Sequence, residues 1–278
     1  MGLRIATNIA SQDVQKNLKS NSMEQEKEYA RLSSGKRITK SADDAAGLAI
    51  SKKLEANNRG LKMANRNANN AISLIQVAEG GLNESTNILT RLRELSVQAA
   101  SDTVGEKERG FLDLEYQQLV QELDRTARTT TFNGMPLLRG ESANGVMDFH
   151  VGAEGGELNR ISFDASFSDA TIENLGIDST TITDKNDASD NLIKIDEAID
   201  KVSAYRANFG SIQSRLQSTI SNLDIAIVNQ DAARSRIEDA DIAESAAKIA
   251  SINIMKAAGT AVLSQANDIP MGAMKLIG

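Results

Sequence analysis

Hydrophobic positions recur every seven residues through the first half of the chain. Between residues 44 and 100 the repeat is carried by Leu54, Leu61, Ala68, Ile75, Leu82 and Leu89. Positions three residues further on include Ala64, Ala71, Ala78 and Leu92. A seven-residue apolar repeat with small residues at the second position predicts one long helix packed as in a coiled coil.

A second long stripe covers residues 191–237, and a shorter amphipathic run covers 106–129. The long stripe has apolar residues alternately three and four apart, at Leu192, Ile195, Ile199, Val202, Phe209, Leu216, Ile220, Leu223 and Ile227. Arg206 and Gln213 interrupt it, which favours a helical bundle over a two-stranded coil. We therefore predict a mainly α fold, a long antiparallel bundle with a seam formed by Leu54, Leu61, Ile75, Leu82, Leu89, Leu192, Ile199, Leu216 and Leu223.

The period changes to two between residues 131 and 165. Asn133-Gly134 is a strong signal for a tight hairpin turn. The alternating runs 147–151 and 161–165 are joined by a glycine-containing loop, which predicts a β-hairpin. Residues 164–190 then hold seven acidic residues and few large apolar ones. We interpret 166–190 as an exposed acidic, Ser/Thr-rich connector that adds nothing to the core.

Both ends of the chain read as apolar-striped helices, over residues 1 to about 45 and 235 to 278. The run 249–263 is among the most hydrophobic in the chain. Ordering a helix of ~40 residues costs on the order of 40–80 kcal/mol of backbone entropy, and each buried Leu or Ile returns only ~1.5–3 kcal/mol. The ends are therefore expected to be buried by assembly, through Val14, Leu18, Tyr29, Leu32, Ile242, Ile249 and Leu263. We predict two discontinuous domains, 1–44 with 236–278, and 45–235.

Composition excludes most other roles. The chain has 31 basic and 38 acidic residues, a net charge of −7, which argues against nucleic-acid binding. It has no cysteine, and His150 is its only histidine, so thiolate chemistry and His/Cys metal sites are ruled out. Residues 184–190 weakly resemble a calcium loop but lack its glycine and its final glutamate. We expect no enzyme activity, no cofactor and no metal.

The first 19 residues contain no apolar stretch of signal-peptide length, so we expect no cleaved leader. The apolar run 249–263 is too short to span a bilayer and contains Lys256. A membrane segment is therefore not expected either.

Several motifs, in order along the chain, resemble bacterial flagellin. They are Arg31-Leu-Ser-Ser-Gly-Lys-Arg-Ile-Thr-Lys-Ser-Ala-Asp-Asp-Ala-Ala-Gly-Leu-Ala-Ile50, Asn67-Ala-Asn-Asn-Ala-Ile-Ser73, Arg91-Leu-Arg-Glu-Leu-Ser-Val-Gln98, Thr131-Phe-Asn-Gly134, Ala233-Arg-Ser-Arg-Ile-Glu-Asp-Ala-Asp241 and Ala258-Gly-Thr-Ala-Val-Leu-Ser-Gln-Ala-Asn267. The resemblance covers about 1–165 and 190–278. Since only about 25 residues separate the hairpin from the last long helix, the chain is similar to a short flagellin without large outer domains.

The resemblance implies a structural subunit that polymerises into the bacterial flagellar filament used for swimming. It implies that the terminal helices of many copies form an inner tube, and that the long helices with the hairpin form the next shell. Its implied partners are further copies of itself, an export chaperone, the filament cap and hook-associated proteins, with export to the outside without a cleaved signal. It also implies a possible contact of Arg91, Leu95 and Glu115 with an animal innate-immune receptor.

Two other interpretations remain at this point. A hook–filament junction protein resembles flagellin at both ends, although the runs 234–239 and 258–261 favour the filament subunit. A coiled-coil signalling or adaptor module would form a defined small oligomer instead of an open polymer.

Overall fold

The computed structural model describes residues 7–140 and 146–274, with side chains as far as residue 269. The first six and last four residues of the expected terminal helices lie outside this part. The elements, in order, are α1 (Ile9–Ser34), α2 (Ala45–Ala99), α3 (Glu106–Thr129), β1 (Thr131–Phe132), β2 (Met135–Pro136), β3 (Val146–His150), β4 (Arg160–Asp164), α4 (Ile172–Leu175), α5 (Lys185–Glu238) and α6 (Ile242–Met274). The mainly α fold with a small β region is confirmed.

The chain divides into two compact units, one made of both ends and one of residues 57–228. The divisions at 56/57 and 228/229 fall inside α2 and α5, whereas the sequence places them at 44/45 and 235/236. Each unit is described by itself below.

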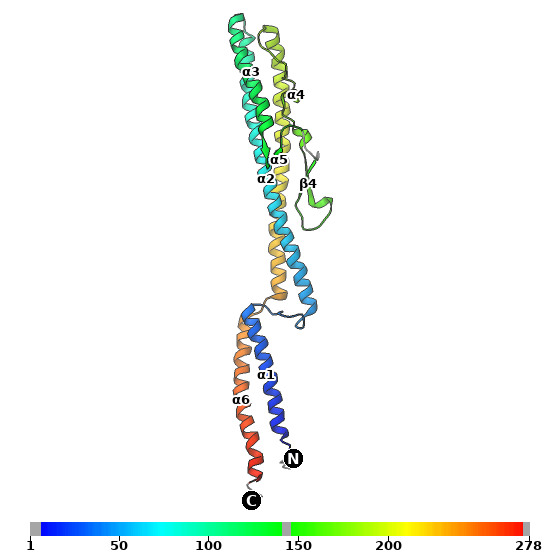
Figure 1. Cartoon of the computed structure of the whole chain (residues 1–278), viewed down its shortest axis with the longest axis vertical. Coiled ribbons are helices and arrows are strands. Elements are labelled where there is room, and N and C mark those ends of the chain that lie inside the picture. Colours follow the sequence, from blue (N-terminus) through cyan, green and yellow to red (C-terminus); the bar gives the residue numbers. More distant parts are fainter. Residues whose placement is uncertain (1–6, 141–145, 275–278) are drawn as a thin grey trace. The chain divides into compact units, whose positions relative to one another are not determined.

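In the 57–228 unit, α2 and α5 run antiparallel along one another (Figure 1). The Asn58 side-chain amide donates to the Ile227 carbonyl at 3.1 Å, and the Arg93 guanidinium lies 2.7 Å from the Asp196 carboxylate. Asn58 and Arg93 are 35 residues apart along α2, and the later of the two contacts the earlier residue of α5, as an antiparallel pair requires. The long helices therefore keep one register over the whole unit.

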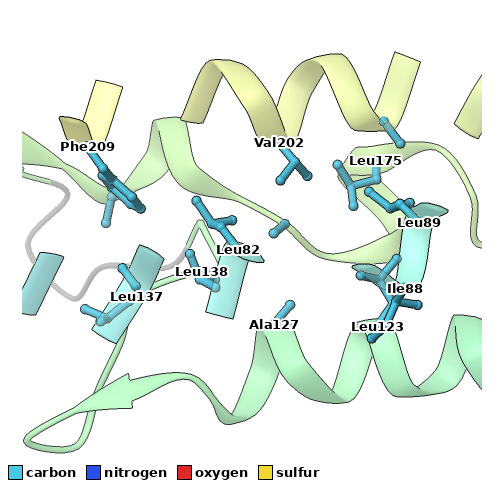
Figure 2. Close-up of a cluster of buried hydrophobic side chains, with 14 of the residues drawn as sticks. Leu82, Ile88, Leu89, Leu123, Ala127, Leu137, Leu138, Leu175, Val202 and Phe209 are labelled. Atoms are coloured by element: carbon cyan, nitrogen blue, oxygen red, sulfur yellow. The ribbon is translucent and has the colours of Figure 1, made fainter. Parts of the chain in front are cut away.

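The core of this unit lies between α2, α3 and α5 (Figure 2). Most of the expected seam residues are buried: Leu61, Ile75, Leu82, Leu89, Leu216 and Leu223. Leu192 and Ile199 are only half-buried, because Ile195 and Ala198 occupy the centre at that level. Leu54 is half-buried and belongs to the other unit.

Both expected hairpin features are present. Asn133 and Gly134 have φ of 50° and 78°, the positive values that a two-residue turn between β1 and β2 requires. Strands β3 and β4 pair antiparallel, with Met147 opposite Phe163. The ring of Phe163 lies 5.3 Å from that of Phe209, so this hairpin packs onto α5.

The segment 166–190 differs from the sequence expectation because it is not an exposed connector. Leu175, Ile177 and Ile182 are at most 2% exposed and belong to the core. Phe167 is exposed, but these three residues point inward, while Glu173, Asp178 and Asp184 stay in solvent. The Tyr116 hydroxyl also bonds to Thr180 at 2.8 Å. Because α5 begins at Lys185, most of the calcium-like run 184–190 is helix and not a loop.

Two adjacent glycines in the middle of α2 give a matched test of this packing. A Cβ at position 80 would meet nothing within 4 Å, whereas one at position 81 would lie 2.7 Å from Thr130 Oγ1 and 2.8 Å from Leu138 Cδ1. We expect Gly80→Ala to raise the free energy of unfolding by up to ~1 kcal/mol, the helix-propensity difference. Gly81→Ala should lower it by about 1–3 kcal/mol, since Leu138 is fully buried and cannot yield. Urea denaturation of both variants checks this; equal midpoints would contradict the packing.

Candidate assembly surface

The two ends of the chain form an antiparallel pair of helices, α1 and α6 (Figure 1). The α1 helix starts at an Asn8 cap, whose side chain accepts from the Ser11 N–H at 3.1 Å. It ends at Gly35, which adopts the left-handed conformation with φ of 67°. The first helix therefore stops ten residues earlier than expected. The α6 helix is capped by Asp241, which accepts from the Ala243 N–H at 2.8 Å.

The side chains between the two helices are mixed and partly polar. On α6 the inward positions alternate by four and three, and Ile249, Ile252 and Ala266 are buried there. On α1 the buried residues are Ser11 and Glu28, which are 6% and 3% exposed. Among the residues predicted for assembly, Val14, Leu18 and Leu263 are half-buried at this contact and Ile249 is buried.

The other predicted assembly residues point to solvent. Tyr29, Leu32 and Ile242 are 49%, 37% and 51% exposed. They belong to a larger set of exposed large apolar side chains on the pair, which also contains Ile9, Met23, Ile254, Met255, Val262 and Ile269. A groove of about 460 Å³ between the helices is also partly apolar, lined by Val14, Leu18 and Val262 among others. Exposed apolar side chains gathered in this way are typical of a surface that binds another protein.

The chain segments next to this pair are tied together around Glu238, which is 4% exposed. Its carboxylate forms an ion pair with Lys36 and accepts from the Ser51 hydroxyl at 2.5 Å. The Arg37 N–H donates to the Glu238 carbonyl at 2.7 Å, and the Ala240 N–H donates to the Gly35 carbonyl at 3.0 Å. The segment that follows α1 and the segment that precedes α6 are thus joined by an antiparallel backbone bridge between Lys36 and Asp239.

Sequence reasoning did not find this tie. Lys36 and Glu238 both lie inside the flagellin-like motifs, but they are 202 residues apart and no periodic pattern connects them. A nearby carboxylate, Asp43, binds Lys27 at 3.0 Å and accepts from the Thr39 and Lys40 N–H groups. Lys27 and these donors hold the pKa of Asp43 well below its usual range.

The tie at Glu238 should depend on pH. Lys36, and after it Ser51, lowers the pKa of the Glu238 carboxyl from its ordinary 4.5, while burial opposes the shift. A lowered folded-state pKa means stabilisation that is present above pH 4.5 and lost as the pH falls through the folded-state value. We expect Glu238→Gln to destabilise the assembled chain by about 1.5–3 kcal/mol at pH 7, the typical worth of hydrogen bonds to a charged group. Melting curves at pH 7 and pH 3 check this: the difference from the unmodified chain should shrink at pH 3, and a constant difference would contradict it.

Arg91 and Glu115 face solvent and pair with one another across α2 and α3. The Arg91 Nη2 lies 2.8 Å from Glu115 Oε1, and Glu94 also binds Arg91. Both carboxylates raise the pKa of the Arg91 guanidinium, Glu115 more than Glu94. Leu95 does not share this surface, because it is 1% exposed and lies in the core. Of the expected trio, the structure therefore leaves Arg91 and Glu115 exposed and places Leu95 in the core.

The described residues offer no assembled chemical site. No cluster of three or more His, Cys, Asp or Glu side chains capable of holding a metal occurs among them. His150 lies at the end of β3, and its carbonyl accepts from Asn67 at 3.1 Å. Over residues 7–140 and 146–274, none of the helices is both long and apolar enough to cross a bilayer.

Comparisons with known proteins agree with this geometry. Residues 5–143 match the bacterial flagellin N-terminal helical region, and residues 192–277 match the C-terminal helical region. The chain is 40% identical to a flagellin of Halalkalibacterium halodurans, over 97% of this chain and 98% of that one. It is 39% identical to a flagellar filament core protein of Brachyspira hyodysenteriae, over 98% and 99% of the two chains. The crystal structure of Bacillus cereus flagellin superposes with a TM-score of 0.50 at 29% identity, covering 57% of this chain and 88% of that one. The chain belongs to the bacterial flagellin family.

Proposed function

We propose that this chain is the structural subunit of a bacterial flagellar filament and serves swimming motility by polymerising. The observation that carries the proposal is the α1–α6 pair, which exposes large apolar side chains along both helices. Relatives that match almost the whole length of the chain are flagellins and filament core proteins, which supports the same role. Family membership and the absence of a metal cluster among the described residues give no support to an enzyme.

The terminal segments 1–44 and 236–278 are proposed to form the filament's inner tube. Contacts between different surfaces on successive copies do not close on themselves, and they generate a helical polymer. Val14, Leu18, Ile249 and Leu263 would hold the pair, while Tyr29, Leu32 and Ile242 would meet other copies. The 45–235 segment, with its hairpin, would form the shell around the tube.

The remaining partners follow from family resemblance alone. We propose an export chaperone, a filament cap and hook-associated proteins as partners, and export to the outside without removal of a leader. Mass spectrometry of the exported protein should find Met1 or Gly2 at its N-terminus. Loss of a longer N-terminal piece would contradict this route.

Recognition by an innate-immune receptor is proposed only for the exposed pair Arg91 and Glu115. We propose that their first role is in contacts between copies, since within one chain their ion pair joins α2 to α3 and leaves both side chains about half exposed. Arg91→Ala is expected to reduce polymer yield as well as receptor activation. A variant that polymerises normally and loses only receptor activation would show that the pair has no role in assembly.

Electron microscopy of the purified protein tests the main proposal. After salting out, negatively stained samples should contain long fibres of uniform width. A discrete small oligomer, seen as compact particles at every salt concentration, would instead support an adaptor module and overturn the filament proposal.

A further inference from the structure

The inward face of α1 is more polar than its role in a helix pair would suggest. Its inward positions are Ser11, Val14, Leu18, Asn21, Gln25 and Glu28, spaced alternately by three and four. Only two of the six are apolar. The hydrophobic contact that normally holds a helix pair together is therefore confined to Val14 and Leu18, the apolar middle of the inward face between Ser11 and Gln25.

The polar residues instead form hydrogen bonds to α6 at specific places. The Ser11 hydroxyl donates to Asn267 Oδ1 at 2.9 Å. Fourteen residues later, Gln25 donates to Asn253 Oδ1 at 2.5 Å and accepts from the Lys256 ammonium at 3.2 Å. These two groups of contacts lie on either side of the apolar middle.

The apolar middle of the inward face also fits only one alignment of α1 on α6. A Cβ at Gly259 would lie 2.8 Å from Leu18 Cδ2, so the leucine occupies space that only glycine leaves open. Sliding α6 by one heptad would bring Ile252 or Ala266 to Leu18 instead. It would also separate Ser11, which is 6% exposed, from Asn267, and an unpaired buried polar group is costly. Gln25 would lose its bonds to Asn253 and Lys256 as well.

We propose that these polar contacts, with the Gly259–Leu18 fit, select a single antiparallel register of α1 on α6, and that this register aligns the outward apolar side chains into one surface for a second copy of the chain. Polar residues at inward positions of helix pairs are known to select register at some cost in stability. The second half of the inference rests on the proposed function. The first half, the selection of the register, concerns contacts within one chain and does not rest on the proposed function.

The outward side of α6 carries the large apolar side chains Ile254, Val262 and Ile269, which is the basis for naming a second copy as the occupant of this surface. Ile252 is 3% exposed and Ile254, two residues later in α6, is 71% exposed. The exposed side of α1 adds Tyr29 and Leu32 among mostly polar residues, so a second copy of the same pair offers apolar side chains that can cover those of α6. These two isoleucines separate the two roles within one helix.

The absence of native cysteine makes the register directly measurable. The double variant Ser11→Cys/Asn267→Cys, assembled into fibres so that α1 and α6 are folded, should form an intramolecular disulfide on mild oxidation. The matched variant Ser11→Cys/Thr260→Cys, displaced by one heptad, should form it at least about tenfold less, because the displaced register removes the bonds of Gln25 and the space beside Gly259 that Leu18 occupies. Adding Gln25→Leu and Asn253→Leu to both should reduce this preference several-fold. Equal yields from the two pairs, or a preference unchanged by the leucines, would overturn the register.

The surface is tested with Ile254→Asn and Ile252→Asn in the same cysteine background. Ile254→Asn should reduce fibre yield at least tenfold, and in the fibres that still form the ratio of the two crosslinks should be unchanged, whereas Ile252→Asn should lower that ratio too. Normal fibres from Ile254→Asn would overturn the assigned surface. If the unmodified chain forms no fibres, the proposed function fails, and with it the expectation that other copies order the two helices. The crosslink ratio in the soluble chain then decides the register.

Discussion

Deletion of residues 249–278 is expected to abolish filament formation and to leave the 57–228 unit folded. The deletion removes most of α6, including Ile249, Ile252 and Ala266 from the contact with α1. It removes nothing from the core cluster, which draws on α2, α3, α5 and the hairpin region. Pelleting after salting out should find no polymer. Circular dichroism should still show cooperative melting within a few degrees of the full-length chain's main transition, since no core contact is lost.

The full-length chain, treated in parallel, is the control for both measurements. Fibres from the shortened chain would show that α6 is dispensable for assembly. Loss of cooperative melting would show instead that the two compact units depend on one another for stability. Either result contradicts the claim that the terminal helices are needed for assembly and that the 57–228 unit folds without them.

The second large effect concerns helix content. The α1 and α6 helices contain 26 and 33 residues, and we expect both to be largely unfolded in the dilute monomer. The contact between them buries few large apolar side chains, each worth only ~1.5–3 kcal/mol, against a backbone entropy cost of ~1–2 kcal/mol per residue. Helices depend mainly on tertiary packing, so these two should form only when other copies cover their apolar side chains.

Far-UV circular dichroism of monomer and polymer at equal protein concentration measures this difference. The monomer should lack helix corresponding to about a fifth of the chain, the share that α1 and α6 represent. The 57–228 unit provides an internal reference, because its helices should contribute equally in both states. Equal helix content in the two samples would contradict coupled folding.

The long helices could be predicted closely because their signal is periodic. The heptad repeat between residues 44 and 100 became α2, Ala45–Ala99, and the run 106–129 became α3 with the same bounds. The Asn133-Gly134 turn was equally readable, because few other dipeptides adopt positive φ at both positions. Local geometry of this kind is encoded within a few adjacent residues.

Features that join distant residues were not predictable in the same way. The acidic composition of 166–190 suggested exposure, but Leu175, Ile177 and Ile182 were enough to anchor the segment in the core. The tie between Lys36 and Glu238 depends on two loops meeting, which no spacing reveals. The early end of α1 had a local signal in Ser33-Ser34-Gly35, where a glycine directly follows the last helical residue.

The candidate surface was only partly visible in the sequence. Apolar stripes identified the terminal helices but could not divide them into inward and outward faces. Leu18 and Ile249 face the partner helix, whereas Tyr29 is exposed. The inward face of α1 could not be recognised because it carries polar residues such as Ser11 and Gln25. A pattern-based assignment places hydrophobic residues on the inside, and here that assignment fails.

Hydrogen exchange of monomer and polymer, resolved along the chain, is the most direct test of the central claim that contacts between copies order the terminal helices. In the dilute monomer, amides of residues 9–34 and 242–269 should exchange almost at once, while those in the core parts of α2 and α5 remain protected. In the polymer, all four segments should be protected. Strong protection of both terminal helices in the dilute monomer would contradict the claim.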